Sequence, residues 1–418
     1  MAGLGRNFQT LLSATVISNL GDGIAAAAAP LLVASRTDDP VLVGLAVFAQ
    51  QLPWLLFSLV SGVYVDRLDR QRLIVVVNVV RGLVIAALAV AVWQGAATLL
   101  VIYAAGFLAG TCETLGDNAS AAMVPAIVSS ADLPRANARL QAAFYLVNRF
   151  AAPPLGAALF VVAMALPFGV NAATFVLAAV LIATMRKVGA DRPVSPGQPV
   201  PSDVPRRSVR ADIVDGVRWL WHEPVIRMLA VALCLMNVTL TAGFSILVLY
   251  SRDRLGLSEV GYGVLITMSA VGGLLGTAVA PRLQGRFDGS VLLRVGLVVE
   301  TLTHVGLALS TTVWLAAPVL VAFGVHASVW NGVTVTIRQR AVPDELRGRV
   351  QSVAMMFSIG GHALGALIGG PIASRLGLAG PFWVSAVVMA GLTAIAWRPF
   401  GRRLVTASPA TTRIRPAR

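Results

Sequence analysis

Long apolar segments separated by short polar intervals dominate the chain. A membrane-spanning α-helix needs about 20 predominantly apolar residues to cross a hydrocarbon core of ~30 Å. The apolar runs are continuous, whereas the strands of a transmembrane barrel alternate between apolar and polar positions. The pattern therefore predicts an all-α polytopic membrane protein with twelve transmembrane helices. The predicted spans are residues 8–34, 41–65, 73–95, 98–122, 140–163, 166–185, 226–250, 260–281, 291–311, 313–337, 350–373 and 378–397.

The longest polar interval divides the spans into two sets of six. Its first part is rich in proline, which is typical of a flexible linker. Its second part, residues 210–221, has the amphipathic pattern of a helix that lies on the inner membrane surface. The predicted parts are an N-terminal six-helix half (1–186), a cytoplasmic linker (187–225), a C-terminal six-helix half (226–397) and a basic cytoplasmic tail (398–418).

The two halves also resemble each other. The interval after the fourth span contains MVPAIVSSADLPRANARLQ, and the interval after the tenth contains AVPDELRGRVQ. Both open with Val-Pro and end with Arg, an aliphatic residue and Gln. Beyond them, Gly156 in PPLGAAL corresponds to Gly365 in HALGALI. Many secondary transporters are built from such repeats and bind their ligand between the halves.

The composition supports a membrane location, since 57% of the residues are hydrophobic and 12% are charged. Of the 33 Lys and Arg residues, Arg36, Arg252, Arg254 and Arg375 lie on one side of the predicted membrane. Arg81 and Arg149 lie inside spans, and the remainder lie on the side of the two termini. Because the positive side is cytoplasmic, both termini are expected in the cytoplasm, with the chain in the bacterial plasma membrane. The net charge of +14 then reflects topology, and no nucleic-acid partner is expected.

Several chemical functions are not indicated. The two cysteines lie within apolar runs, and the four histidines and two cysteines lack the spacing of metal ligands. No glycine-rich phosphate loop with Lys-Ser/Thr is present, so ATP is not the expected energy source. The first apolar run continues to Val33, which is too long for a cleaved signal segment. We predict no cofactor, no metal and no enzymatic activity.

Two segments resemble motifs of the major facilitator superfamily. SGVYVDRLDRQRL, after the second span, resembles its signature loop, although Asp69 stands where glycine is usual. RFAAPPLGAAL, in the fifth span, resembles its antiporter motif, with Ala152 and Ala157 in place of glycines. With VPDELRGRV and a Gly-Asp in the first span, the chain is similar to the branch that holds the enterobactin exporter and macrolide efflux proteins. The signature positions are Gly62, Asp66, Arg67, Arg70 and Arg72, and those of the antiporter-like motif are Pro153, Pro154 and Gly156.

The signature loop is a candidate gate. Asp66 could face the N-terminus of a neighbouring helix, where the dipole favours a negative charge by ~0.3–1 kcal/mol. The resemblance implies that this neighbour is the eleventh span and that the contact holds the outward-open state, with Arg70 adding a charge-assisted link. The alternative is a short basic turn that only sets topology.

Asp22 is the main candidate for proton coupling. It lies ~21 Å along the first span from Phe8, at a depth where a carboxyl group costs ~2.5–3.5 kcal/mol. Such a group faces a cavity or a partner, and desolvation disfavours its charged form. Asp22 is expected to exchange a proton or to anchor a cationic substrate, with Gly21 and Gly23 allowing close approach. The alternative is a structural aspartate that caps a broken helix.

Other polar side chains lie inside spans. Glu113 and Asp117 are four residues apart on one helix face, and Arg149 lies at a similar depth in the next span, so a Glu113–Arg149 ion pair is predicted, either structural or part of a switch. Glu300 and His304 of the ninth span are also four residues apart, as in a proton relay, but the resemblance places this span at the periphery, where a local pair is expected. It places the seventh and tenth spans on the central cavity. The cavity candidates are Asn237, Thr241, Ser245, His326, Trp330 and Asn331.

These expectations combine into a secondary active transporter of the major facilitator fold. It would export a small amphipathic organic molecule (a drug, siderophore or secondary metabolite) by proton antiport and alternating access, as a monomer in the lipid bilayer. The alternatives are a proton-coupled nutrient importer, an integral-membrane enzyme, or a membrane sensor that transports nothing.

The gate hypothesis predicts that Asp66→Ala changes the balance between inward-open and outward-open states. The measurement is transport together with labelling of single cysteines placed on each side of the membrane. Unchanged transport and unchanged labelling would leave the loop with a topological role alone.

Overall fold

The computed structural model describes residues 4–186, 217–343 and 346–402, without the side chains of residues 59, 60, 62–67, 347, 348 and 402. This part of the chain is helical and contains no strand. The N-terminal elements are α1 (Arg6–Ala34), α2 (Pro40–Arg67), α3 (Arg70–Trp93), α4 (Leu99–Ile127), η1 (Ser130–Asp132), α5 (Leu133–Ala143), η2 (Phe144–Ala151), α6 (Ala152–Val162) and α7 (Leu166–Ala183). The C-terminal elements are α9 (Pro224–Phe244), α10 (Leu247–Leu249), η3 (Tyr250–Arg254), α11 (Glu259–Arg286), α12 (Gly289–Leu309), α13 (Val313–Ala341), α14 (Arg347–Leu376) and α15 (Gly380–Arg402).

Twelve helical segments of the described chain are long and apolar enough to cross a membrane, which confirms the predicted number. The fifth span is continuous through η1, α5, η2 and α6, and η2 is a π-helix. Side chains cap several helix starts: the Asp69 carboxylate accepts a hydrogen bond from Arg72 N, and Thr98 caps α4. The predicted surface helix lies mostly outside the described residues, although residues 217–222 are helical.

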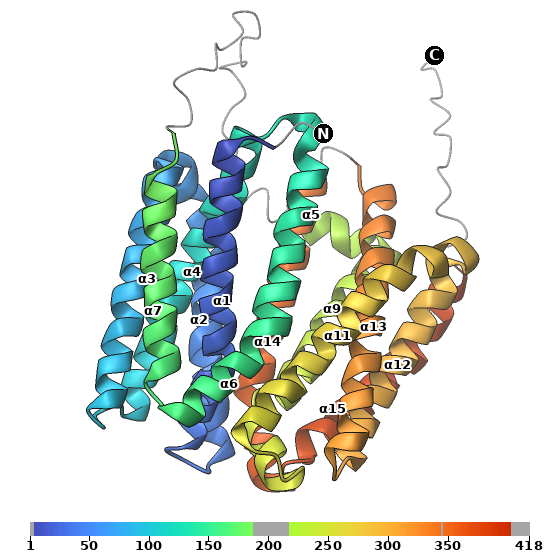
Figure 1. Cartoon of the computed structure of the whole chain (residues 1–418). Helices are drawn as coiled ribbons and strands as arrows, with labels where there is room; N and C mark the ends of the chain where they lie inside the picture. Colours follow the sequence, from blue (N-terminus) through green and yellow to red (C-terminus); the bar gives the residue numbers. More distant parts are fainter. Residues whose placement is uncertain (1–3, 187–216, 344–345, 403–418) are drawn as a thin grey trace, which may run out of the picture.

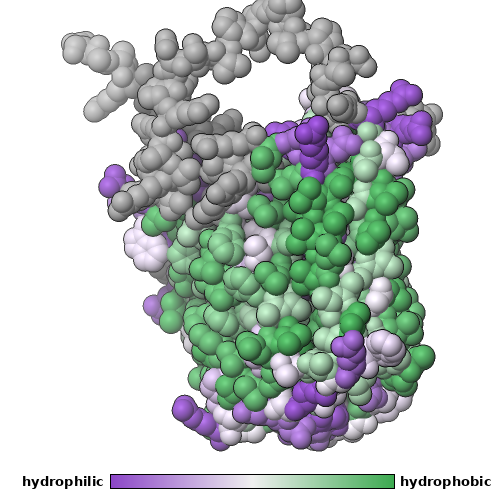
Figure 2. Space-filling model, turned by 90° about the vertical axis from the view of Figure 1, so that its left-hand side faces the viewer, coloured by the Kyte–Doolittle hydropathy of each residue, from purple (hydrophilic) through white to green (hydrophobic). Residues whose placement is uncertain are grey.

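The spans form two bundles, α1–α7 and α9–α15, as predicted (Figure 1). Within the first bundle, α1 packs on α6 and α7, and α3 packs on α4 and α7. Within the second, α11 packs on α13, α9 on α14 and α12 on α15. The main contacts between the bundles join α2 to α14 and α6 to α11. Figure 2 shows a broad hydrophobic band between two polar ends, as expected for a surface that faces lipid.

Glycines allow the helices to approach closely. Gly361, Gly365 and Gly369, which recur every four residues in α14, lie against backbone carbonyls of α9. In the other half, Gly156 of α6 lies against the Ile24 carbonyl of α1. Van der Waals contact between backbones replaces the hydrophobic effect as the force between helices in lipid.

Among the described residues, the buried apolar contacts between the halves gather at one end of the molecule. The terminal end is the end at which α1 begins and α15 stops; the far end carries the turns 35–39 and 245–258 (Figure 1). One buried apolar cluster at the far end joins both halves and includes Leu32, Val248 and Phe382. Two clusters near the terminal end each belong to a single half. The structure is therefore closed at the far end.

An ion pair also joins the halves at the far end. Arg252 Nη2 lies 2.7 Å from Asp38 Oδ1, and Arg252 Nη1 donates to the Ala34 carbonyl at 3.3 Å. Asp253 lies 2.6 Å from Arg252 Nε, and the two carboxylates raise the pKa of the guanidinium. Asp38 is largely exposed, so the pair contributes ~0.2–1 kcal/mol to the closed arrangement.

The packing of α1 on α6 predicts that Gly156→Ala destabilises the protein. The new methyl group would overlap the Ile24 carbonyl, a backbone atom that cannot rotate away, and overpacking of this kind costs ~1–3 kcal/mol. The measurement is the apparent melting temperature of the purified protein in detergent. Gly391→Ala in α15 is the matched control, because a methyl group there meets nothing within 4 Å. Equal melting temperatures for the two variants would contradict this packing.

Candidate functional site

Asp22 lies in the interior of the N-terminal half. Its neighbours Gly21 and Gly23 lie against Asn171 of α7 and the Asn148 carbonyl of η2, so these glycines admit helices close to the carboxylate. Asp22 Oδ1 accepts a hydrogen bond of 2.8 Å from Arg81 Nη2 of α3. The Asp22 side chain keeps 24% of its exposure, which leaves the carboxylate reachable from a cavity.

Arg81 joins three elements at this point. Besides Asp22 on α1, its Nη2 lies 3.8 Å from Glu113 Oε2 on α4, and its guanidinium lies 4.1 Å from the ring centre of Phe175 on α7. The side chain is 8% exposed, and its Nε has no hydrogen-bond partner among the described residues. The sequence places Arg81 inside a span but does not identify its partner. The pattern that indicates a partner is an arginine within a span of a half whose other spans carry Asp22, Glu113 and Asp117.

The predicted Glu113–Arg149 ion pair is wrong for this conformation. Glu113 is close to Arg81, and in the described chain no ion pair within 4 Å joins it to Arg149. The Arg149 guanidinium lies 5.3 Å from the ring centre of Phe144 in its own segment. The prediction assumed a regular α-helix, whereas the π-helical turn η2 rotates the side chains around Arg149 relative to α4.

These charged groups line a cavity of about 460 Å³ within the N-terminal half. Asp22, Arg81, Glu113, Asp117 and Arg149 all contribute to its wall. The other lining side chains are largely apolar, with aromatic and amide groups among them: Trp54, Phe144, Phe168, Phe175, Gln50 and Gln51. A cavity of this size with apolar walls and a few convergent polar groups suits a small amphipathic molecule.

The six candidates of the C-terminal half do not line this cavity. Asn237 Nδ2 donates to Ser358 Oγ at 2.8 Å across the α9–α14 contact, and Thr241 and Ser245 face Gly365 and Gly369 of the same contact. Gly361, Gly365 and Gly369 of α14 pack against the polar face of α9, so these side chains do not face the cavity.

The candidates in α13 also lie elsewhere. His326 and Trp330 are buried in the C-terminal half, where His326 Nε2 lies 3.2 Å from Glu300 Oε2. Asn331, the next residue after Trp330, is exposed and does not line the cavity. The assignment of a span to the centre of the fold does not fix which of its faces points inward.

The antiporter-like motif lies at the junction of three helices. Pro153 and Pro154 open α6 and lie against Gly263 of α11, while Gly156 lies against α1. Within η2, Asn148 donates to the Asn19 carbonyl at 3.2 Å, and Thr267 of α11 donates to the Phe150 carbonyl at 3.3 Å. The motif therefore connects the helix that carries Asp22 with the opposite half.

The signature loop is described only in part. The side chains of Gly62, Asp66 and Arg67 lie outside the described residues, so the gate stays a prediction. Arg70 Nη1 donates to the Ala122 carbonyl of α4 at 3.0 Å. Arg72 receives the Asp69 cap through its backbone, which gives a structural reason for an aspartate at this position.

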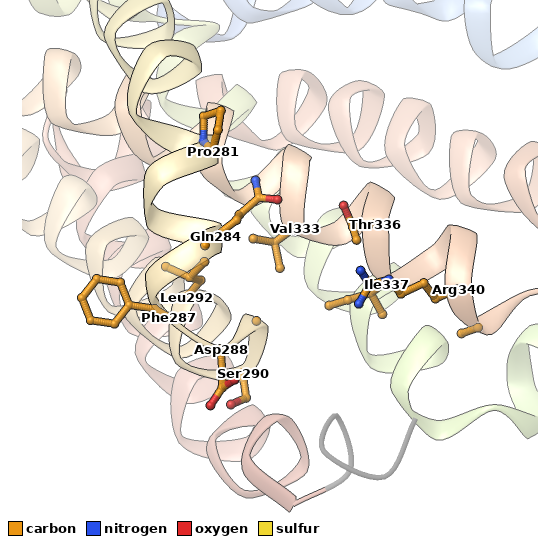
Figure 3. A pocket seen from close by; sticks show the side chains of 13 residues that line it. Pro281, Gln284, Phe287, Asp288, Ser290, Leu292, Val333, Thr336, Ile337 and Arg340 are labelled. Atoms are coloured by element: carbon orange, nitrogen blue, oxygen red, sulfur yellow. The ribbon is translucent and has the colours of Figure 1, made fainter. Parts of the chain in front are cut away.

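A second hollow, of about 650 Å³, lies at the terminal end of α11, α12 and α13 (Figure 3). Gln284, Thr336, Asp288 and Arg340 line it, and the last two are exposed. Its two charged side chains stand at helix ends, without the burial that makes Asp22 and Arg81 unusual. The N-terminal cavity is therefore the stronger candidate site.

Comparison with known proteins gives consistent relatives. A family model described as "Transmembrane secretion effector" matches residues 4–404. The multidrug efflux pump Tap of Mycolicibacterium fortuitum is 27% identical over 398 residues, covering 92% of this chain and 94% of the relative. The enterobactin exporter EntS of Salmonella typhimurium is 26% identical over 368 residues, covering 87% of this chain and 85% of the relative.

Solved structures share the fold. The nucleoside transporter NupG matches with a TM-score of 0.72 at 12% identity, over 95% of this chain and 100% of the other. A bacterial homologue of the iron transporter ferroportin, in an inward-facing state, matches with a TM-score of 0.71 at 16% identity, over 94% of this chain and 100% of the other. At these identities the likeness concerns the fold alone.

The geometry predicts that Asp22 and Arg81 depend on each other for stability. Arg81→Met leaves two carboxylates in a low-dielectric site without their counter-charge, and breaking a buried pair costs ~3–5 kcal/mol. The double variant with Asp22→Asn should lose less than the sum of the single losses. The measurement is thermal stability of the four proteins in detergent. Arg294→Met on α12, remote from this site, is the control: its loss of stability and that of Asp22→Asn should simply add in the double variant. If the losses of Arg81→Met and Asp22→Asn also add, the pairing is refuted.

Proposed function

Because the chain belongs to the transmembrane secretion effector family of the major facilitator superfamily, we propose that it exports a small amphipathic organic molecule in exchange for protons. The proposed substrate is a drug, a siderophore or a secondary metabolite. Support comes from the relatives, which are named as a multidrug efflux pump and an enterobactin exporter. The observation on which the proposal mainly rests is the Asp22–Arg81 ion pair in the wall of a cavity that is otherwise mainly apolar.

The proposed coupling follows from competition for one carboxylate. When Asp22 is ionised, Arg81 holds it at 2.8 Å. Protonation of Asp22 removes that attraction and leaves Arg81 with Glu113, which already lies 3.8 Å away. A cationic or hydrogen-bonding substrate competes for the same acids, so that proton binding and substrate binding exclude each other. Ligands that favour different states shift the equilibrium between those states.

Alternating access follows from the contacts between the halves. We propose that the terminal end faces the cytoplasm, in agreement with the distribution of arginine. The closed far end would then face outward, and the protein would load its substrate from inside. Opening outward requires the far-end cluster and the Asp38–Arg252 pair to separate. Because one half of one chain supplies the whole cavity, a monomer suffices.

The testing experiment uses inverted membrane vesicles that carry a proton gradient, reported by an acridine dye. A panel of amphipathic cations, macrolides and catecholate siderophores is added, and loss of the gradient is recorded. Wild type should dissipate the gradient with at least one compound, and Asp22→Asn should lose at least nine-tenths of that response. Asp288→Asn is the matched control, since this exposed aspartate does not line the cavity.

The outcomes separate the alternatives. A full response from Asp22→Asn would overturn the proton role of this residue. If intact cells accumulate a compound, and the accumulation increases with the proton gradient, the protein is an importer instead. A compound that both variants export without using the gradient would identify a carrier that is not coupled to protons.

A further inference from the structure

Three ionisable side chains meet in the interior of the C-terminal half, away from the cavity. Glu300 Oε1 lies 3.5 Å from His304 Nε2 on α12, and Glu300 Oε2 lies 3.2 Å from His326 Nε2 on α13. Glu300 and His304 are each 1% exposed, and His326 is 7% exposed. Glu300 stands ~16 Å along α12 from its first residue, close to the middle of the membrane.

The cluster lacks other polar partners. Both Glu300 oxygens, both His304 nitrogens and His326 Nε2 have no hydrogen-bond partner of suitable geometry among the described residues. Buried polar atoms are normally satisfied, so each such atom needs an explanation. A neutral imidazole has only one N–H to donate, and an added proton gives one of the two histidines a second N–H and a positive charge opposite the carboxylate.

Among the described residues, only His304 and His326 place a basic nitrogen within 4 Å of the Glu300 carboxylate. The other described ionisable side chains of α12, α13 and the helices packed against them are Arg227, Cys234, Glu259, Tyr262, Arg282, Arg286, Arg294, Arg338, Arg340 and Arg398. Arg294, the nearest of these along α12, donates to the Trp397 carbonyl at 2.8 Å.

We propose that Glu300, His304 and His326 form a proton-binding site in the C-terminal half, separate from the Asp22 site. Without a proton the cluster is a single negative charge buried in the bundle, which is strongly unfavourable. With one proton its net charge is zero. When that proton is on an imidazole, the positive charge lies either on His304 of the same helix or on His326 of α13, so its position decides whether the ion pair lies within α12 or joins α12 to α13.

Trp330 provides a local reporter. Its ring centre lies 5.9 Å from that of His326, and Gly296 of α12 lies against both side chains. A protonated imidazole quenches the fluorescence of an indole in contact with it, whereas a neutral imidazole quenches little. The fluorescence of Trp330 therefore follows protonation of His326 without any substrate or transport.

The experiment titrates the purified full chain in detergent from about pH 5 to pH 9, the range in which histidine sites change charge. The Trp330 signal is obtained by subtracting the trace of Trp330→Phe from that of wild type. We expect one titration step in this difference signal. The step should be lost in Glu300→Gln, because the remaining histidines have no counter-charge, and in the His304→Gln/His326→Gln double variant.

Two controls make the result specific. His222→Gln/His362→Gln removes the same number of histidines elsewhere in the chain and should keep the step. Asp22→Asn should also keep it, so failure of the proposed transport mechanism and failure of this site are distinguishable. A difference signal that does not change with pH in wild type would overturn the proposal. A step that persists in Glu300→Gln would also overturn it. Because this substitution is isosteric, the proposal stays testable even if the double variant does not fold.

Discussion

The N-terminal half depends on how one buried arginine is shared between acids on two other helices. Arg81 bonds Asp22 at 2.8 Å and approaches Glu113 to 3.8 Å, while its flat face covers the ring of Phe175. Removing any partner from such a site leaves a charge that the bundle cannot solvate. The helices α1, α3, α4 and α7 are therefore held in one arrangement as long as the charges stay as they are. A change of charge at Asp22 therefore alters the interactions of Arg81 with all of these helices.

The close approach of α1 to its neighbours makes this arrangement possible. Gly21 and Gly23 flank Asp22 and let α7 and η2 reach the backbone of α1, while Gly156 lets α6 approach α1 at Ile24, the residue after Gly23. The Phe150 carbonyl of the π-helix η2 accepts a hydrogen bond from Thr267 of the opposite half. The helix that carries the acid is thus connected, through η2 and α6, to the α6–α11 contact between the halves. In the proposed mechanism, this connection couples the charge of Asp22 to movement of one half against the other.

The fold could be predicted from the sequence because the membrane imposes a simple rule on length and composition. The twelve spans follow from runs of apolar residues, and the cost of a buried carboxylate singled out Asp22. The partners could not be predicted in the same way. Depth along a helix is readable from a sequence, but rotation is not, and the π-helical turn at Arg149 changes the rotation locally. Glu113 therefore meets Arg81 rather than Arg149.

The same argument explains the polar residues of the C-terminal half. Asn237 donates a hydrogen bond to Ser358 between α9 and α14, and His326 lies against Glu300. Side chains that could bind a ligand are therefore used inside the bundle. The two halves share a repeat in sequence but differ in where they keep their charges. The N-terminal half exposes acids and arginines to a cavity of about 460 Å³, whereas the C-terminal half encloses Glu300 with two imidazoles. In the proposed mechanism a small molecule competes for the first set of charges, whereas the buried second set binds only a proton. On these proposals the two halves take different ligands, although their sequences share a repeat.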